Sequence, residues 1–217
     1  PYERLKEDIK MMKDAGMNVV RIAESTWSTL EPSNGKFDFT YIDRVLELVE
    51  KEGMKAIIGT PTYAIPSWLS NEDSDIMVTT KQGQAKYGHR QIMNIANNTF
   101  RFYAERVIRK LIEHTVNTNC VIGFQIDNET KHYGTANEYV QKMFKEYLIE
   151  KFKTTENFNK TFGLAYWSNS ISNWDDLPDM RGCINGGLAS EFEKFQRTLA
   201  AQYLMWQSEI IKEIINL

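Results

Sequence analysis

The chain has 217 residues, of which 42% are hydrophobic and 25% charged, as in an ordinary soluble globular domain. Its 26 basic and 29 acidic residues give a net charge of -3, so the basic surplus of a typical nucleic-acid binder is missing. No apolar run approaches the roughly 20 residues of a membrane span. The composition excludes a disordered chain, a collagen and a coiled-coil rod, and we expect neither nucleic acid nor a membrane as a partner.

Residues that bind metals or form disulfides are sparse. Cys120 and Cys183 are too few for a disulfide framework, and we expect two buried thiols. The three histidines lie far apart and lack the HExxH spacing of a zinc site, so no cofactor is expected. The charged residues after Pro1 show no signal-peptide pattern, which favours a cytoplasmic protein. A start at Pro1 also fits a chain cut from a longer one, so an upstream signal stays open.

Helical and strand patterns alternate along the chain. Leu5 and Ile9 begin a helical spacing that ends at Gly16, and a short apolar stretch rich in β-branched residues follows. The same order then returns, opened by Thr40 and Asp43, which resemble a capping box. In chain order, the predicted elements are a helix from Leu5 to Gly16, a strand over 17–23, a helix from Thr40 to Gly53, a strand over 54–60, a helix over 99–117, a strand over 120–126, a helix over 136–153 and a helix from 191 to the end.

These repeated units predict an α/β protein with a parallel sheet, because each crossover helix returns the chain to the same end of the sheet. By pattern alone, a doubly wound sheet and a (β/α)8 barrel fit equally well. Every long loop follows a strand, whereas the helix-to-strand turns are short. This asymmetry favours the barrel, in which loops after strands build the active site. No linker divides the chain, so residues 1–217 are interpreted as one domain.

Glu129 is the first catalytic candidate, because it lies just past the strand predicted over 120–126. A carboxylic acid in a partly apolar cleft can hold a proton near neutral pH and deliver it to a leaving oxygen. Its neighbour Asn128 carries an amide that can hydrogen-bond a substrate hydroxyl. From these residues and Asp127 alone, a solvated polar strand end remains the alternative interpretation.

Further candidates lie in the long loops. Arg90 has the forked donors that bind a sugar hydroxyl or orient a carboxylate, or it is a plain surface arginine. Glu24 and Glu31 follow the first strand, and Glu24 could face the site, whereas Glu31 could simply fix a loop. Three aromatic residues offer ring faces for a sugar, although aromatics mostly serve packing: Trp27, Tyr63 and Trp68.

Five segments, in order along almost the whole chain, resemble glycoside hydrolase family 42 β-galactosidases. Residues 125–129 (QIDNE) resemble the Q.DNE motif that ends the family's fourth barrel strand. Residues 162–168 resemble its WGT.FWS stretch, with Leu164 and Ala165 where Thr and a varied residue are usual. The other matching segments are residues 21–39, which resemble the start of the family's sequence, residues 59–69, which resemble its TPT…P.WL segment, and residues 88–91, which resemble its G.R segment.

The resemblance implies a retaining (β/α)8 glycosidase acting on terminal β-galactosides. It gives the acid/base role to Glu129 and substrate binding to Asn128 and Arg90. It also implies a partial barrel, about strands 2–4 with the helices that follow them. The first strand would then precede Pro1, and the nucleophile, a glutamate near the end of the seventh strand, would follow Leu217. Trimers are common in the family, so a homotrimeric parent enzyme is a further expectation.

Two points depart from the family or stay open. Many members hold a structural zinc with four cysteines, and the corresponding positions here carry none, so we expect no such zinc. These positions are Asn94, Gly134, Ala136 and Tyr139. The alternatives in function are another retaining glycosidase of the same barrel type, such as a β-glucosidase or α-L-arabinosidase, and a non-catalytic sugar-binding fragment.

Overall fold

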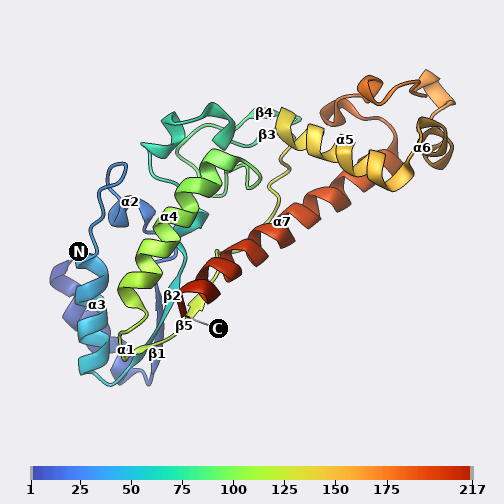
Figure 1. Cartoon of the computed structure of the whole chain (residues 1–217). Helices are drawn as coiled ribbons and strands as arrows, with labels where there is room; N and C mark the ends of the chain where they lie inside the picture. The colour runs from blue at the N-terminus through green and yellow to red at the C-terminus, as the bar shows by residue number, and fades with distance from the viewer. Residues whose placement is uncertain (1, 216–217) are drawn as a thin grey trace.

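The computed structural model describes residues 2–215 and contains a three-stranded parallel sheet (Figure 1). The strands lie in the order β1-β2-β5, with β1 and β5 at the edges of the sheet. The prediction of an α/β chain with a parallel sheet is therefore confirmed. The strands and their crossover helices are β1 (Val19–Ile22), α3 (Thr40–Lys51), β2 (Lys55–Gly59), α4 (Asn98–Thr115) and β5 (Val121–Gln125), preceded by η1 (Tyr2–Arg4) and α1 (Leu5–Asp14).

The two faces of the sheet differ in chemistry. Ile22 lies opposite Ile58 in the register, and both belong to an apolar cluster with the buried faces of α1 and α3. Because side chains alternate along a strand, the other face presents polar groups. There, Arg21 of β1 donates a hydrogen bond from Nη1 to Oε1 of Gln125 in β5, at 2.6 Å. One face of the sheet is thus packed against helices, and the other carries polar side chains that bridge the strands.

The amphipathic helices lie where their periodicity predicts them, with one local correction at the start of α3. In α4, the apolar Phe102 is 64% exposed, because the buried stripe of that helix runs along other positions. Thr40 and Asp43 form no capping box. Instead, Asp38 accepts a hydrogen bond from the backbone N–H of Thr40 at 2.9 Å, and Asp43 lies 2.5 Å from Nε2 of His114. The fully buried positions of α4 include Val107, Ile108, Leu111 and Ile112.

Long loops follow all three strands of the parallel sheet, as predicted, and the turns from helix to strand are short, but a further long loop over 163–185 joins two helices. The sequence gives no periodicity over residues 61–96, yet the structure forms a small hairpin there. Strands of two residues each are too short to leave an alternating pattern. The elements in these loops are α2 (Trp27–Leu30), η2 (Pro61–Tyr63), η3 (Leu69–Asn71), η4 (Ser74–Ile76), β3 (Thr79–Thr80) and β4 (Gly83–Gln84).

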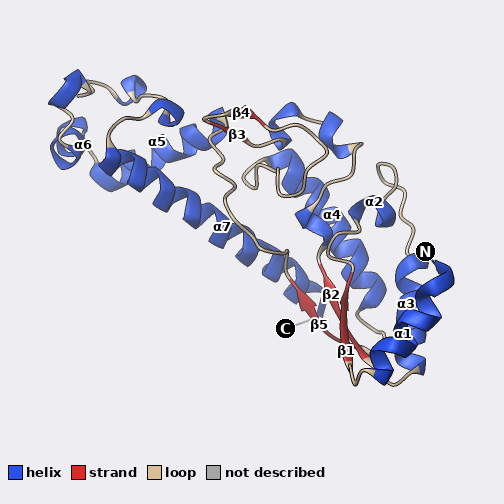
Figure 2. Ribbon diagram, turned by 180° about the vertical axis from the view of Figure 1, so that it is seen from behind, coloured by secondary structure: helices blue, strands red, loops and turns tan. Residues whose placement is uncertain are grey.

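The second half of the chain forms an arm that projects from the sheet (Figures 1 and 2). Phe144 of α5 contacts Phe192 of α7, with ring centroids 4.9 Å apart. Helix α7 begins at Gly186 rather than at residue 191, and its C-terminal part returns to lie beside α4. Among residues 2–215, no helix is both long and apolar enough to cross a membrane. The arm consists of α5 (Glu138–Phe152), α6 (Thr155–Phe162), η5 (Tyr166–Ser168), η6 (Trp174–Asp176), η7 (Met180–Gly182) and the first part of α7 (Gly186–Ile215).

A buried ion pair fixes the loop after β1. Glu31 is 0% exposed and accepts hydrogen bonds from the Trp27 indole at 3.0 Å and the backbone N–H of Gly35 at 2.8 Å. The guanidinium of Arg106 in α4 completes the site. The indole of Trp68 donates to the Glu31 carbonyl at 2.8 Å. A buried carboxylate needs such partners, so Glu31 fixes the loop, and both tryptophans serve packing.

We predict that Glu31→Gln destabilises the protein, because it leaves Arg106 without its counter-charge. Breaking a fully buried pair costs about 3–5 kcal/mol. Since the Arg106 side chain is 26% exposed, we expect a loss of about 2–3 kcal/mol in the free energy of unfolding. The control is Glu113→Gln, which removes an exposed partner of Lys110 on the same helix and should cost less than about 1 kcal/mol. Equal losses in the free energy of unfolding for the two variants, measured by urea unfolding, would contradict the prediction.

Candidate active site

The candidate residues gather where the strands end. Because β1, β2 and β5 are parallel, their carboxyl ends meet at one edge of the sheet. The ladder continues past β2, since the backbone N–H of Thr60 donates to the carbonyl of Gln125 at 2.9 Å. Residues 60–63 therefore lie beside residues 126–130, at the edge away from the helix-to-strand turns (Figure 2).

Asp127 is buried at this edge, with 1% of its surface exposed. One carboxylate oxygen accepts a hydrogen bond from the hydroxyl of Thr62 at 2.8 Å, and the other accepts from the hydroxyl of Thr130. The backbone N–H donates to the Thr60 hydroxyl at 2.7 Å, and the carbonyl accepts from the Gln125 amide at 2.7 Å. Burial raises the pKa of this carboxyl, and the hydrogen bonds from the two threonines oppose that shift.

The backbone turns sharply after Asp127. Asp127 and Glu129 have φ of 49° and 48°, in the left-handed region that residues other than glycine rarely adopt. Such conformations persist only where surrounding contacts hold them, and the hydrogen bonds of Asp127 supply these contacts. The turn leaves Asn128 partly buried and Glu129 exposed. Neither side chain has a hydrogen-bond partner within the described part of the chain, so both can meet a ligand. The described residues do not enclose Glu129 in an apolar cleft.

Arg90 is held against Tyr63, which follows β2. Its Nη1 donates to the Tyr63 hydroxyl at 2.5 Å, and its guanidinium carbon lies 5.6 Å from the centre of the ring. The backbone N–H of the next residue, Gln91, donates to the Tyr63 carbonyl at 3.2 Å. Tyr63 is 5% exposed, whereas Arg90 is exposed. The tyrosine is therefore a support for the arginine rather than an open platform for a sugar.

The phenol of Tyr133 connects the two loops electrostatically. Its hydroxyl is buried and has no side-chain hydrogen-bond partner among the described residues. Burial raises its pKa, the charge of Asp127 raises it further, and the backbone N–H of Lys131 opposes both. Tyr63 and Glu129 add smaller contributions. Tyr133 is thus within electrostatic range of Tyr63, from the loop after β2, and of Asp127 and Glu129, from the loop after β5.

Glu24 lies at the same edge, after β1, as expected. Its Oε2 pairs with Nε of Arg21 at 2.7 Å, and Arg21 also bonds Gln125, whose amide supports Asp127. The approach of the first two strand ends is close. A Cβ on Gly59 would lie 2.8 Å from the Cβ of Glu24, so only glycine fits there. Glu24 therefore takes part in the support of the site through its pairing with Arg21.

A polar cluster lies where the resemblance would place the zinc cysteines. The Thr135 hydroxyl, between positions 134 and 136, lies within hydrogen-bond distance of the side-chain oxygens of Asn94, at 3.1 Å, and Asn137, at 3.0 Å, and can donate to either. Asn94 is fully buried. Over residues 2–215, no group of three or more histidine, cysteine, aspartate or glutamate side chains is placed to hold a metal ion. The residues present here form hydrogen bonds, and amide and hydroxyl oxygens are poor zinc ligands compared with thiolates.

Sequence reasoning selects Glu129, Asn128 and Arg90 but misses the residues that hold them. Thr60 and Thr62 lie directly after β2, at the end of the sheet where the candidate residues gather, and this position is the signal that could have identified them. Gln207, which contacts both threonines, leaves no local signal because it is distant in sequence.

Comparison with known families agrees with this geometry. A model of glycoside hydrolase family 42, described as beta-galactosidase, matches residues 1–216. The beta-galactosidase BgaA of Clostridium cellulovorans is 30% identical over 215 residues, covering 96% of this chain and 32% of the relative. The beta-galactosidase of Thermus thermophilus is 33% identical over 181 residues, covering 82% and 28%. The chain is thus of the glycoside hydrolase class. Within that class it belongs to family 42.

Solved structures show the same fold. A beta-galactosidase from the psychrophilic Marinomonas ef1 superposes with a TM-score of 0.90 at 26% identity, covering 98% of this chain and 34% of that one. A beta-galactosidase from Halorubrum lacusprofundi also gives a TM-score of 0.90, at 27% identity, covering 99% and 33%. This chain spans about a third of the length of the curated relatives it matches.

The raised pKa of Asp127 predicts a pH dependence of stability. The folded protein holds this proton more tightly than the unfolded chain, so the stability that Asp127 contributes falls as pH rises from below 3.8 through the raised folded value, and is level above it. Asp127→Asn does not titrate, and its altered hydrogen bonds give an offset independent of pH. The stability of the variant relative to the wild type should therefore grow across this window in urea unfolding. If the stability of the wild type instead rises relative to that of the variant as pH rises, the hydrogen bonds lower the pKa of Asp127 by more than burial raises it.

We predict that the protein holds no tightly bound zinc, because the four relevant positions supply no thiolate. Elemental analysis of the purified, dialysed protein is the measurement. One zinc per chain would contradict the prediction. The four positions are Asn94, Gly134, Ala136 and Tyr139.

Proposed function

We propose that this chain is part of the catalytic (β/α)8 barrel of a β-galactosidase that hydrolyses terminal β-D-galactosides with retention. Membership in family 42, whose matched relatives are named beta-galactosidases, supports the substrate class. The parallel sheet, with its long loops at the carboxyl ends of the strands, supports the architecture. In this proposal, residues 1–217 form one domain that supplies the acid/base half of the site.

The outer edge of β5 supports the barrel architecture. Ile122 in this edge strand is 56% exposed, and no strand among the described residues pairs with the outer edge of β5. A further strand laid along β5 would pair that edge, and closure of the sheet would remove it. An apolar hollow runs along this edge between β5 and the end of α7, with Val121, Ile122, Phe124, Ile126 and Ile211 among its lining residues.

The position of Glu129 is the observation that carries the proposed mechanism. It is an exposed carboxyl on a turn fixed directly after a strand, with no competing hydrogen-bond partner among the described residues. In the first step, Glu129 gives its proton to the glycosidic oxygen while a second carboxylate attacks the anomeric carbon and the leaving group departs. In the second step, Glu129 takes a proton from the water that hydrolyses the covalent intermediate. We place the second carboxylate in a part of the barrel that this chain does not supply.

Arg90 and Asn128 are the proposed sugar-binding residues. The Asn128 amide offers both a donor and an acceptor to a hydroxyl beside the scissile bond. Arg90, fixed by Tyr63, presents its remaining guanidinium donors from the loop after β2. Fixing the arginine before substrate arrives reduces the entropy lost on binding.

We predict that Glu129→Gln in the full-length protein strongly reduces kcat/KM for alkyl galactosides, whose poor leaving groups need a proton. General acid catalysis typically contributes about 100- to 10,000-fold, and a loss of that order is expected. Dinitrophenyl galactoside, whose leaving group departs unprotonated, should lose far less. The ratio kcat/KM is compared because it reports the steps up to formation of the covalent intermediate.

The control for this prediction is Glu156→Gln, which removes an exposed carboxylate of the arm and should leave both substrates unaffected. Equal losses on both substrates in Glu129→Gln would argue against an acid role.

A panel of nitrophenyl glycosides decides the sugar, since preference for a glucoside or an arabinoside would replace β-galactosidase by one of those activities. Sugar binding without turnover by the full-length protein would mean a non-catalytic role. We also propose a cytoplasmic homotrimer for the assembled enzyme.

A further inference from the structure

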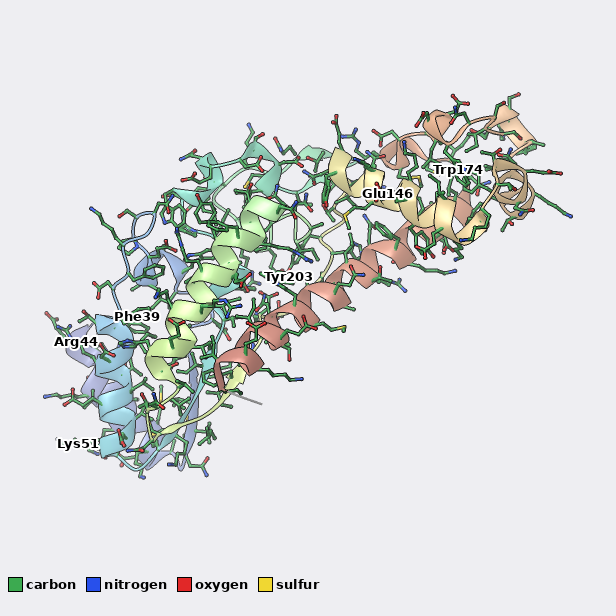
Figure 3. The ribbon with its side chains drawn as sticks, viewed as in Figure 1. Phe39, Arg44, Lys51, Glu146, Trp174 and Tyr203 are labelled. Atoms are coloured by element: carbon green, nitrogen blue, oxygen red, sulfur yellow. The ribbon has the colours of Figure 1, made fainter. Side chains whose placement is uncertain are left out.

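Gln207 of α7 reaches the end of β2 and is fully buried there. It lies one turn beyond Tyr203, which Figure 3 labels where α7 runs beside α4. Its Oε1 accepts a hydrogen bond from the hydroxyl of Thr60 at 2.7 Å, and its Nε2 donates to the hydroxyl of Thr62 at 3.0 Å. Both threonines also bond Asp127, two residues before Glu129.

These four hydrogen bonds form a closed circuit through Asp127, Thr60, Gln207 and Thr62, in which each group donates to the next. The backbone N–H of Asp127 can only donate, so the Thr60 hydroxyl accepts from it at 2.7 Å and turns its own proton toward Gln207. This choice places Oε1 of Gln207 toward Thr60 and the amide N–H toward Thr62. The Thr62 hydroxyl, having accepted there, donates its proton to the Asp127 carboxylate at 2.8 Å. The backbone N–H of Asp127 thus fixes the direction of these bonds, and the Gln207 amide passes that direction from the Thr60 hydroxyl to the Thr62 hydroxyl.

The circuit holds the residue whose backbone begins the strained turn. It fixes the N–H and one carboxylate oxygen of Asp127, while φ at Asp127 is 49° and at Glu129 is 48°. Without these bonds, the turn loses contacts that keep it in the left-handed region. Because Glu129 follows only two residues later, a rotation at Asp127 displaces the Glu129 carboxyl. Misplacement of a reacting group by about 1 Å can cost about 100-fold in rate.

We propose that Gln207 is a positioning residue, which orients Glu129 through Thr60, Thr62 and Asp127 without touching the substrate. This proposal rests on the acid/base role proposed above for Glu129. A packing role for Gln207 would be served equally by an apolar side chain of the same length. An orienting role needs an acceptor and a donor on opposite sides of one planar group, and among neutral side chains of this length only glutamine provides both.

The experiment compares Gln207→Met and Gln207→Glu in the full-length protein. Methionine keeps the length but removes the circuit. Glutamate nearly keeps the shape, but its carboxylate accepts from both threonines, so the Thr62 proton turns away from Asp127. Both variants should lower kcat/KM for alkyl galactosides about 10- to 100-fold and affect dinitrophenyl galactoside much less. Adding Gln207→Met to Glu129→Gln should lower the alkyl rate little further, because the two act on one proton transfer.

The matched control is Gln196→Met, which removes another buried glutamine of α7. Its amide donates to the Thr135 carbonyl at 2.7 Å and has no link to Asp127. It should lower the melting temperature about as much as Gln207→Met, with equal effects on the two substrates. Equal effects of Gln207→Met on both substrates, or none, would overturn the positioning role. If that variant does not fold, Thr62→Val, which removes one hydroxyl at constant shape, is judged by the same two outcomes. A Glu129→Gln variant without leaving-group dependence would instead overturn the acid role itself.

Discussion

The rest of the site depends on the hydrogen bonds that pair the buried polar atoms of Asp127. A carboxyl and a peptide group withdrawn from water at a strand end are costly unless every polar atom is paired. Here the partners come from separate elements: two threonines after β2, and Gln125 of β5, itself bonded by Arg21 of β1. The turn that carries Glu129 can therefore adopt its conformation only when the three strands are correctly assembled. Assembly of the sheet and placement of the Glu129 side chain are thus coupled.

Much of the fold follows from local pattern, because its units repeat. Gly16 with Met17 and Gly53 with Met54 mark the same point between a helix and a strand, and the structure places β1 and β2 directly after them. Features that depend on only a few residues were missed. The hairpin of β3 and β4 is held by a two-residue ladder, and the start of α3 is capped by Asp38 from outside the pattern that suggested Thr40. Such details depend on which of several nearby groups forms the hydrogen bond, and the spacing of residues in the sequence does not determine that.

The residues of the candidate site also fall into two groups, those that lie within local motifs and those that tertiary contacts bring together. Glu129, Asn128 and Arg90 lie within local motifs, so the sequence points to them, and their roles stay predictions. Their supports are set by tertiary contacts. Gln207 meets Thr60 and Thr62 across separations of 147 and 145 residues, and a glutamine within a long helix looks like any polar helical residue. Its function is visible only once the helix is docked, because the direction of the hydrogen bonds, rather than the residue type, carries the information.

Helix α7 joins this local geometry to the arm. Its 30 residues span about 45 Å at 1.5 Å per residue. Phe192 and Phe195 near its start pack on Phe144 of α5, and Gln207 lies in its C-terminal half. A helix moves largely as a unit, so both contacts constrain one body. Apolar packing tolerates small shifts, whereas hydrogen bonds lose strength steeply with distance and angle. The aromatic contacts therefore set where the helix lies, and Gln207 sets the final fit that the turn of Glu129 needs.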